Sequence, residues 1–207
     1  MKKSCLSLLS VAVVLTAGAV STFGQAVPSA TSTPQAYNFR LRALVELKNL
    51  QTQLVGLAQA MPADKYTWRP APGVRSVAEV YLHVCAGNFG LTALAGAPPQ
   101  PGFKFQGFEK STTDKKQIVE QLNASFEYAR SGIEKMSDAD MLKPLKFQDQ
   151  STVGDMIVHI VAHGHEHLGQ SIAYARMNGV VPPWTAAQQQ RQPAAAGQQA
   201  PQRPSQE

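Results

Sequence analysis

The fold of this chain is decided by one stretch of its C-terminal half, Thr152-Val-Gly-Asp-Met-Ile-Val-His-Ile-Val-Ala-His-Gly-His-Glu-His-Leu-Gly-Gln-Ser-Ile-Ala-Tyr-Ala-Arg-Met-Asn-Gly179. Apolar residues recur along it at the three- and four-residue spacing of one helix face. Thr152 and Asp155 form a capping-box pattern at its start, and Asn178-Gly179 is a typical helix end. The sequence therefore predicts a helix that begins at Ser151 or Thr152 and ends near residue 178.

Three further helices are expected upstream, each with a single apolar face. A leucine repeat predicts the first over 36–61, and the capping box of Ser76-Val-Ala-Glu79 begins a second that reaches about residue 94. A third covers about 113–136, after a proline-rich loop at 97–102 in which a helix cannot continue. Because no strand pattern separates these segments, we predict an all-α fold, a four-helix bundle.

The N-terminus has the pattern of an export signal. Met1-Lys2-Lys3 precedes an apolar stretch from Leu6 to Val20, which is too short and too interrupted by serine for a membrane span, and Gly24-Gln25-Ala26 offers a cleavage site. An uncleaved N-terminal anchor is the alternative. We expect an exported protein, periplasmic or secreted, with no stable membrane span once the signal is removed.

Composition divides the chain into four parts. A signal peptide at 1–26 and a disordered tether at 27–35 precede the helical domain at 36–184. A Gln/Pro/Ala tail at 185–207 has no aromatic residue to bury and is expected to be disordered. The domain has the size of one ordinary globular unit. After cleavage at Ala26 it contains one cysteine, Cys85, so a disulfide within one chain is excluded.

Net charge gives no argument for a nucleic-acid partner. The whole chain carries +5. Lys2 and Lys3 account for two of these charges, and Arg191, Arg203 and Glu207 in the tail account for one more, which leaves +2 for residues 36–184. So small an excess does not indicate a phosphate-binding surface.

The histidines are concentrated on the second and fourth helices. Four of the five lie within nine residues, and His163 and His167 are one helical turn apart near the border of the apolar face. Such a pair can hold one divalent ion, and His83 on the second helix can supply a third ligand across the core. Three neutral imidazoles leave a coordination position open, as in sites that activate bound water.

Other readings of these residues remain open. The cluster can instead be a solvated helix face or a chance metal-binding tract. His159 is expected to turn toward solvent or the rim of the site. Glu79 can orient a ligand or simply cap its helix, and Gln170 can touch the site or simply pack. A zinc-protease reading of His165-Glu166 fails because Gly169 occupies the place of the second histidine.

Three segments together resemble the DinB-like superfamily of metal-binding four-helix bundles. They are Met61-Pro-Ala-Asp-Lys-Tyr-Thr-Trp-Arg-Pro70, Arg75-Ser-Val-Ala-Glu-Val-Tyr-Leu-His83 and His159-Ile-Val-Ala-His-Gly-His-Glu-His-Leu-Gly-Gln170. The resemblance implies a divalent metal held by His83, His163 and His167, and chains that pair as dimers. Some relatives activate a low-molecular-weight thiol, and others are described as metal-dependent hydrolases. This sequence departs from the pattern by its export signal and by two additional histidines.

These observations predict an exported metal-dependent hydrolase or transferase that activates a water or a thiol. Zinc or nickel is the expected metal, with iron or manganese as alternatives. The expected partners are an unidentified small-molecule substrate and a second copy of the chain, with no nucleic acid. The alternative is a non-catalytic metal-binding or stress-related helical bundle.

Overall fold

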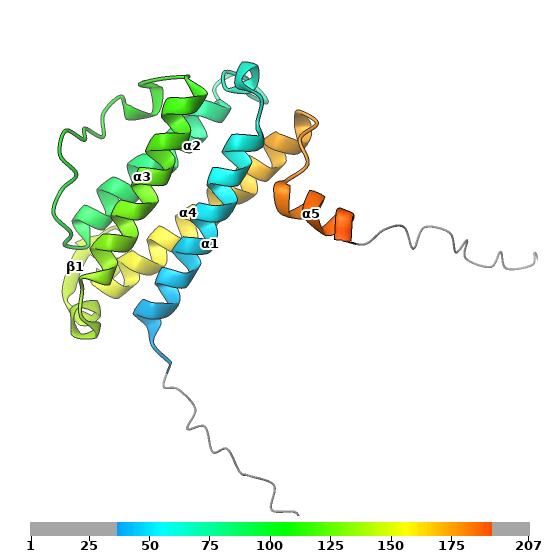
Figure 1. The fold of residues 1–207 in the computed structure, drawn as a ribbon. Coiled ribbons are helices and arrows are strands. Elements are labelled where there is room, and N and C mark those ends of the chain that lie inside the picture. Colours follow the sequence, from blue (N-terminus) through cyan, green and yellow to red (C-terminus); the bar gives the residue numbers. More distant parts are fainter. Residues whose placement is uncertain (1–36, 192–207) are drawn as a thin grey trace, which may run out of the picture. The chain divides into compact units, whose positions relative to one another are not determined.

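The computed structural model describes residues 37–191, and their fold is mostly helical (Figure 1). Four long helices, α1 (Phe39–Ala60), α2 (Val77–Leu94), α3 (Lys115–Glu134) and α4 (Val153–Met177), lie within two residues of the sequence-based bounds except at the start of α1. The expected signal peptide and tether lie outside the described residues.

Side chains cap the four long helices at their first turns. Asn38 and Asp114 each accept a hydrogen bond from the backbone of α1 and α3, respectively. Ser76 with Glu79, and Thr152 with Asp155, form the two capping boxes that the sequence predicts for α2 and α4. Each cap satisfies backbone N–H groups that have no partner inside the helix, so helix ends are fixed by local sequence.

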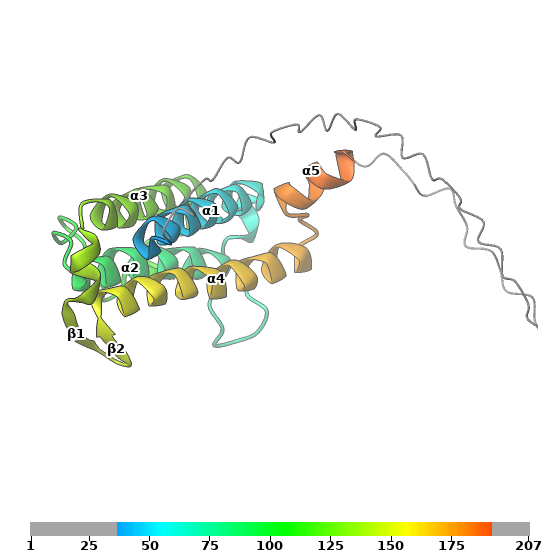
Figure 2. The same ribbon diagram turned by 90° about the horizontal axis from the view of Figure 1, so that it is seen from below.

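The long helices pack in two layers. α1 contacts α3 and α4, and α2 contacts the same two helices (Figure 2). The repeat Leu47, Leu50, Leu54 and Leu57 of α1 is fully buried between them, as are Ile118, Leu122, Phe126, Ala129 and Ile133 of α3. α2 is apolar and long enough to cross a membrane by length and composition, but most of it is buried against its neighbours, which accounts for its apolar residues.

A β-hairpin corrects the expectation of a fold without strands. β1 (Pro144–Phe147) and β2 (Gln150–Thr152) pair antiparallel between α3 and α4, after the short helix η3 (Asp138–Leu142). Four and three residues are too few for a clear alternation, and the tip, Gln148-Asp149, contains no glycine, so the usual turn signal is missing. Gln148 adopts φ 51°, a conformation that side chains rarely take.

A short helix corrects the expected start of the disordered tail. α5 (Pro183–Arg191) extends the ordered chain past residue 184, with Pro183 at its first position, where proline is tolerated. Pro183 lies against Gly56 of α1. Residues 192–207 lie outside the described part of the chain.

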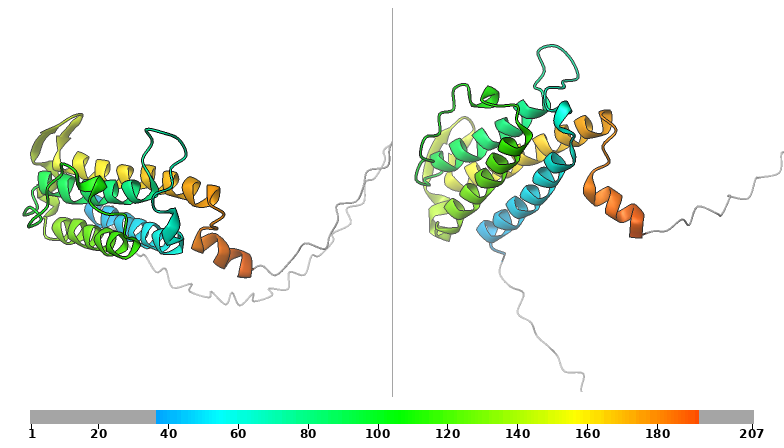
Figure 3. Two further views of the ribbon diagram at one scale, coloured as in Figure 1. Left: turned by 90° about the horizontal axis from the view of Figure 1, so that it is seen from above. Right: turned by 45° about the horizontal axis from the view of Figure 1, so that its top comes forward.

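The connection between α2 and α3, residues 95–114, returns along the length of α2 (Figures 1 and 3). It contains the short helix η2 (Phe108–Lys110), which contacts α2. Phe103 and Phe108 pack on Phe89 of α2, whereas Phe105 is 62% exposed. Phe103 and Phe108 therefore help to hold this connection against α2. The hairpin and the 61–76 connection lie toward opposite ends of the long helices (Figure 3).

Candidate metal centre

Three histidine rings meet between α2 and α4. His83 comes from α2, and His163 and His167 come from adjacent turns of α4. One ring nitrogen of each lies within 4.8 Å of the other two, and Nε2 of His83 is 3.0 Å from Nε2 of His163. The structure thus brings together the three histidines that the sequence spacing singled out.

Close contact of the two helices depends on Gly87. A Cβ atom at this position would lie 2.4 Å from Cε1 of His163, well inside van der Waals contact. The His163 ring therefore occupies the space that a side chain at position 87 would fill. Gly87 is one turn after His83 on the same face of α2. This face therefore supplies the His83 ring and leaves room for the His163 ring.

Glu109 fixes the orientation of the His83 ring. Its Oε1 lies 2.6 Å from Nδ1 of His83, and Arg75 donates from Nε to Oε2 at 2.7 Å. Because a carboxylate only accepts, Nδ1 of His83 carries the proton and Nε2 presents its lone pair to the cluster. Burial alone would raise the pKa of Glu109, but hydrogen bonds from Arg75 and His83 outweigh it and hold that pKa below its usual value.

Gln170 performs the same function for His167. Its Oε1 lies 2.8 Å from Nδ1 of His167, and its Nε2 donates to the hydroxyl of Tyr174 at 3.1 Å. That hydroxyl donates to the backbone carbonyl of Arg75 at 3.1 Å, which fixes the direction of the chain of bonds. Nδ1 of His167 is therefore the donor, and Nε2 is left with its lone pair. Of the two roles considered for Gln170, contact with the site is therefore the one observed.

Burial keeps two of the rings neutral. It lowers the pKa of His163 to about 3, with His167 and His83 adding to the effect, and it lowers the pKa of His167. Within the described residues, the buried Nδ1 of His163 has no hydrogen-bond partner. Zinc, nickel and similar ions bind neutral imidazole nitrogens well. In His83 and His167, a hydrogen bond on Nδ1 fixes the ring so that the lone pair of Nε2 faces the cluster. The three residues fit a divalent metal ion.

The other candidate residues have different surroundings. Glu79 caps α2 and lies 3.2 Å from Arg69, so it takes the capping role. His159 is half-buried one turn before His163, with 6.5 Å between the ring centroids, at the rim of the site. His165 points away toward Glu46 on α1, at 3.7 Å. Cys85 is fully buried, and burial raises the pKa of its thiol to about 12, so it is inert packing.

Comparison with known proteins identifies the family of the chain and a similar fold. Residues 46–171 match the family model of the DinB superfamily. The chain belongs to the DinB superfamily. A crystal structure of a DinB-like protein from Bacillus cereus ATCC 10987 is similar in fold, with a TM-score of 0.58 and 16% sequence identity over 70% of this chain and 93% of the other. The curated proteins include no match to the sequence.

Sequence reasoning missed one residue of this DinB-superfamily centre, Glu109. Its partner His83 is 26 positions earlier in the chain, and no helical spacing relates the two. One signal was available, since Glu109 is the only acidic residue between the end of α2 and Asp114, the N-cap of α3. A lone carboxylate in a loop that follows a histidine helix is a candidate partner for that histidine.

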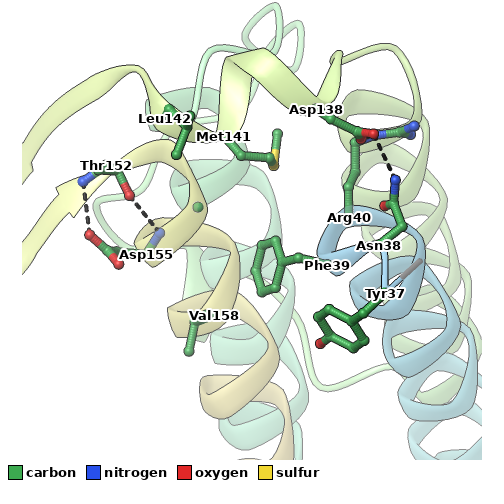
Figure 4. A pocket seen from close by; sticks show the side chains of 11 residues that line it. Tyr37, Asn38, Phe39, Arg40, Asp138, Met141, Leu142, Thr152, Asp155 and Val158 are labelled. Atoms are coloured by element: carbon green, nitrogen blue, oxygen red, sulfur yellow. Dashed lines mark hydrogen bonds and ion pairs between the residues drawn. The ribbon is translucent and has the colours of Figure 1, made fainter.

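A pocket of about 450 Å³ at the hairpin end of the long helices of this DinB-superfamily protein is not a second centre (Figure 4). It lies between the first turns of α1 and α4, and no histidine or cysteine of residues 37–191 lines it. Its polar side chains hold the fold together, since Asn38 donates to Asp138 at 2.6 Å, and Asp155 accepts from the backbone of Thr152. These groups are occupied with capping and are not free for chemistry.

Proposed function

We propose that this protein holds one divalent metal ion with His83, His163 and His167 and acts as a metal-dependent hydrolase or transferase on a small molecule. The observation that carries the proposal is the approach of the three ring nitrogens to within 4.8 Å, with the outer nitrogens of two rings already hydrogen-bonded. An ion held by three imidazoles keeps one position open and lowers the pKa of a water or thiol bound there. Zinc and nickel suit the nitrogen ligands best.

The protein's own groups would hold the site rigid. Glu109 and Gln170 keep two ring protons away from the cluster, and Arg75 keeps Glu109 ionised. Burial on α2 and α4 keeps bulk water from two of the rings. These contacts support a preorganised ligand set on rigid helices, and the similar fold of the Bacillus cereus protein supports a four-helix bundle of the DinB type.

Elemental analysis of the protein purified without a histidine tag tests the metal site. We expect one ion per chain in the parent protein, and we expect His163→Ala to lose it. His165→Ala is the matched control, because His165 is on the same helix two residues away but faces Glu46. Full metal content in His163→Ala would reject the proposal.

A non-catalytic metal-binding bundle is the second candidate. Two carboxylates near the cluster, Glu109 and Glu79, are already engaged, Glu109 by Arg75 and His83, and Glu79 by Arg69 and its own helix end. Neither is free to act as a general base. Turnover of ester, amide or thiol substrates that disappears with His83→Ala would decide for the enzyme, whereas a full metal complement without turnover would favour the non-catalytic role.

We also propose that the chain is exported and pairs with a second copy. The N-terminal pattern supports cleavage after Ala26, which mass spectrometry of the exported protein would test. Exposed apolar side chains on α1 and α4, at Leu41, Val45 and Val158, support pairing. Light scattering should give twice the mass of one chain, and Val158→Glu should reduce it to one.

A further inference from the structure

A pocket of about 460 Å³ opens beside the histidine cluster, in the groove between α2 and α4. One wall is a single face of α2, where His83, Gly87, Gly90 and Leu94 recur at three- and four-residue spacing. His163 and the residue one turn before it, His159, line the opposite side. Its volume is in the range that encloses a small organic molecule.

The pocket is apolar except near the histidines. Leu91 and Leu94 come from α2, Phe105 from the returning connection, and Phe147 from the hairpin. Among the described residues, no Asp, Glu, Lys or Arg lines it, and its polar side chains are those of His83, His159, His163 and Gln148. A ligand's charge would have no partner in such a pocket and would lose its hydration there, so the part of a ligand that fills it is uncharged.

A charged hollow of about 550 Å³ lies behind the cluster, on the side of Glu109 and Gln170. Its basic residues are Arg69, Arg75 and Lys110, but none of the three histidines lines it. Arg75 is paired with Glu109, and Arg69 with Glu79. An anionic ligand would have to break these pairs and still would not reach a ring nitrogen, so the apolar pocket is the better substrate site.

We propose that the pocket between α2 and α4 selects substrates that carry an uncharged aromatic or branched apolar group next to the atom that binds the metal. This inference rests on the proposed function, because it takes the three histidines as metal ligands. Phe105 and Phe147 contact the apolar group, and His83 and His163 lie at the end where the metal-binding atom is held. Small thiols with charged groups are poor ligands.

Gly90 offers a way to fill the pocket without disturbing the ligands. A Cβ atom there would lie 3.8 Å from Cδ2 of Phe105, an ordinary contact, whereas a Cβ atom at Gly87 would collide with His163. Leucine at position 90 would extend into the pocket two turns after His83. Gly169 provides the matched control, since it is exposed on α4 and a Cβ atom there meets nothing within 4 Å.

The experiment measures thiol binding to the Co²⁺-loaded protein through the thiolate-to-cobalt absorption band. The probes are benzyl mercaptan, 2-mercaptoethanol and 2-mercaptoethanesulfonate, which are apolar, neutral and anionic, respectively. We expect benzyl mercaptan to bind at least about tenfold more tightly than either of the others, because its ring leaves water. Gly90→Leu should remove this preference and leave 2-mercaptoethanol binding within about twofold, and Gly169→Leu should change neither.

Cobalt stoichiometry separates the two proposals. If the protein binds one Co²⁺ but all three thiols bind equally, or Gly90→Leu leaves the benzyl mercaptan preference intact, the pocket proposal is overturned and the metal site is retained. If no Co²⁺ binds, both are overturned. Phe105→Ala is a second variant, at an exposed loop residue whose loss does not threaten folding, and it should weaken benzyl mercaptan binding several-fold.

Discussion

Hydrogen bonds on Nδ1 of His83 and of His167 decide which nitrogen of these two rings a metal would meet. His83 depends on Glu109, and His167 depends on Gln170. The two supports differ, since one is an anion and the other a neutral amide. An anionic acceptor raises the electron density of the opposite nitrogen more than a neutral one does, so Glu109 should contribute more to metal affinity.

Replacing Glu109 by Gln should therefore weaken metal binding about tenfold or more. The amide keeps the size of the side chain but removes the charge opposite Nδ1 of His83. Competition with a chromophoric chelator measures the change. Glu46→Gln is the control, because the two carboxylate side chains are similarly exposed, 23% for Glu46 and 26% for Glu109, but Glu46 faces His165. Equal affinity of the two variants would contradict the role given to Glu109.

Burial of His163 predicts acid sensitivity of the metal-free protein. The ring takes up a proton near pH 6.5 in the unfolded chain, but in the folded chain its pKa is lowered to about 3. The unfolded state therefore binds more protons between these values. The free energy of unfolding is unaffected by this group above about pH 6.5 and decreases as the pH falls toward 3, by up to about 1.4 kcal/mol per pH unit.

Urea unfolding with a chelator present, at pH 7.5 and pH 5, measures this dependence. His163→Ala should show a smaller loss of stability between the two pH values than the parent protein. His165→Ala should show the parent's loss, because its ring is exposed. A loss that His163→Ala leaves unchanged would assign the acid sensitivity to other groups.

At the scale of elements, the contact between α2 and α4 sets the site. Gly87→Ala places a methyl group where the His163 ring lies, so the ring must move and metal affinity should fall at least about tenfold, since supporting changes of this kind typically cost that much. Chelator competition measures it, with Gly169→Ala as the control in the same pair of helices. Unchanged affinity in Gly87→Ala would show that the ring can shift without consequence.

The sequence predicts helices better than it predicts what joins them. Capping boxes and apolar faces are local signals, so the ends of α2, α3 and α4 could be read from neighbouring residues. The positions of His163 and His167 on one face follow from the same helical period. Glu109 could not be found in this way, because it reaches His83 from a loop 26 residues further along the chain. The hairpin is local, but its strands are too short for a clear alternation and Gln148-Asp149 carries no turn signal.

At the scale of the whole molecule, metal binding and folding should be coupled. The three histidines come from helices that meet only in the folded chain, so an ion bound to them stabilises the native state alone. Zn²⁺ at 100 times its dissociation constant should raise the free energy of unfolding by about 2.7 kcal/mol. Chemical denaturation with and without Zn²⁺ measures the increase.

Two variants test whether the stabilising Zn²⁺ binds at the histidine cluster. His83→Ala should lose it, and His159→Ala should keep it, because the ring centroid of His159 is 6.5 Å from that of His163, outside the trio. An equal increase in stability in both variants would place the ion elsewhere on the protein.

The return of residues 95–114 along α2 has a consequence for how related proteins can diverge. This one segment supplies both Phe105 at the mouth of the pocket and Glu109 behind His83. In the proposed substrate pocket, mutation near Phe105 would alter which molecules fit, while His83, His163 and His167 stay in place. A rearrangement that moves Glu109 would also release the His83 ring. Relatives that take different ligands in this pocket should therefore vary residues 104–106 but preserve the length of the segment.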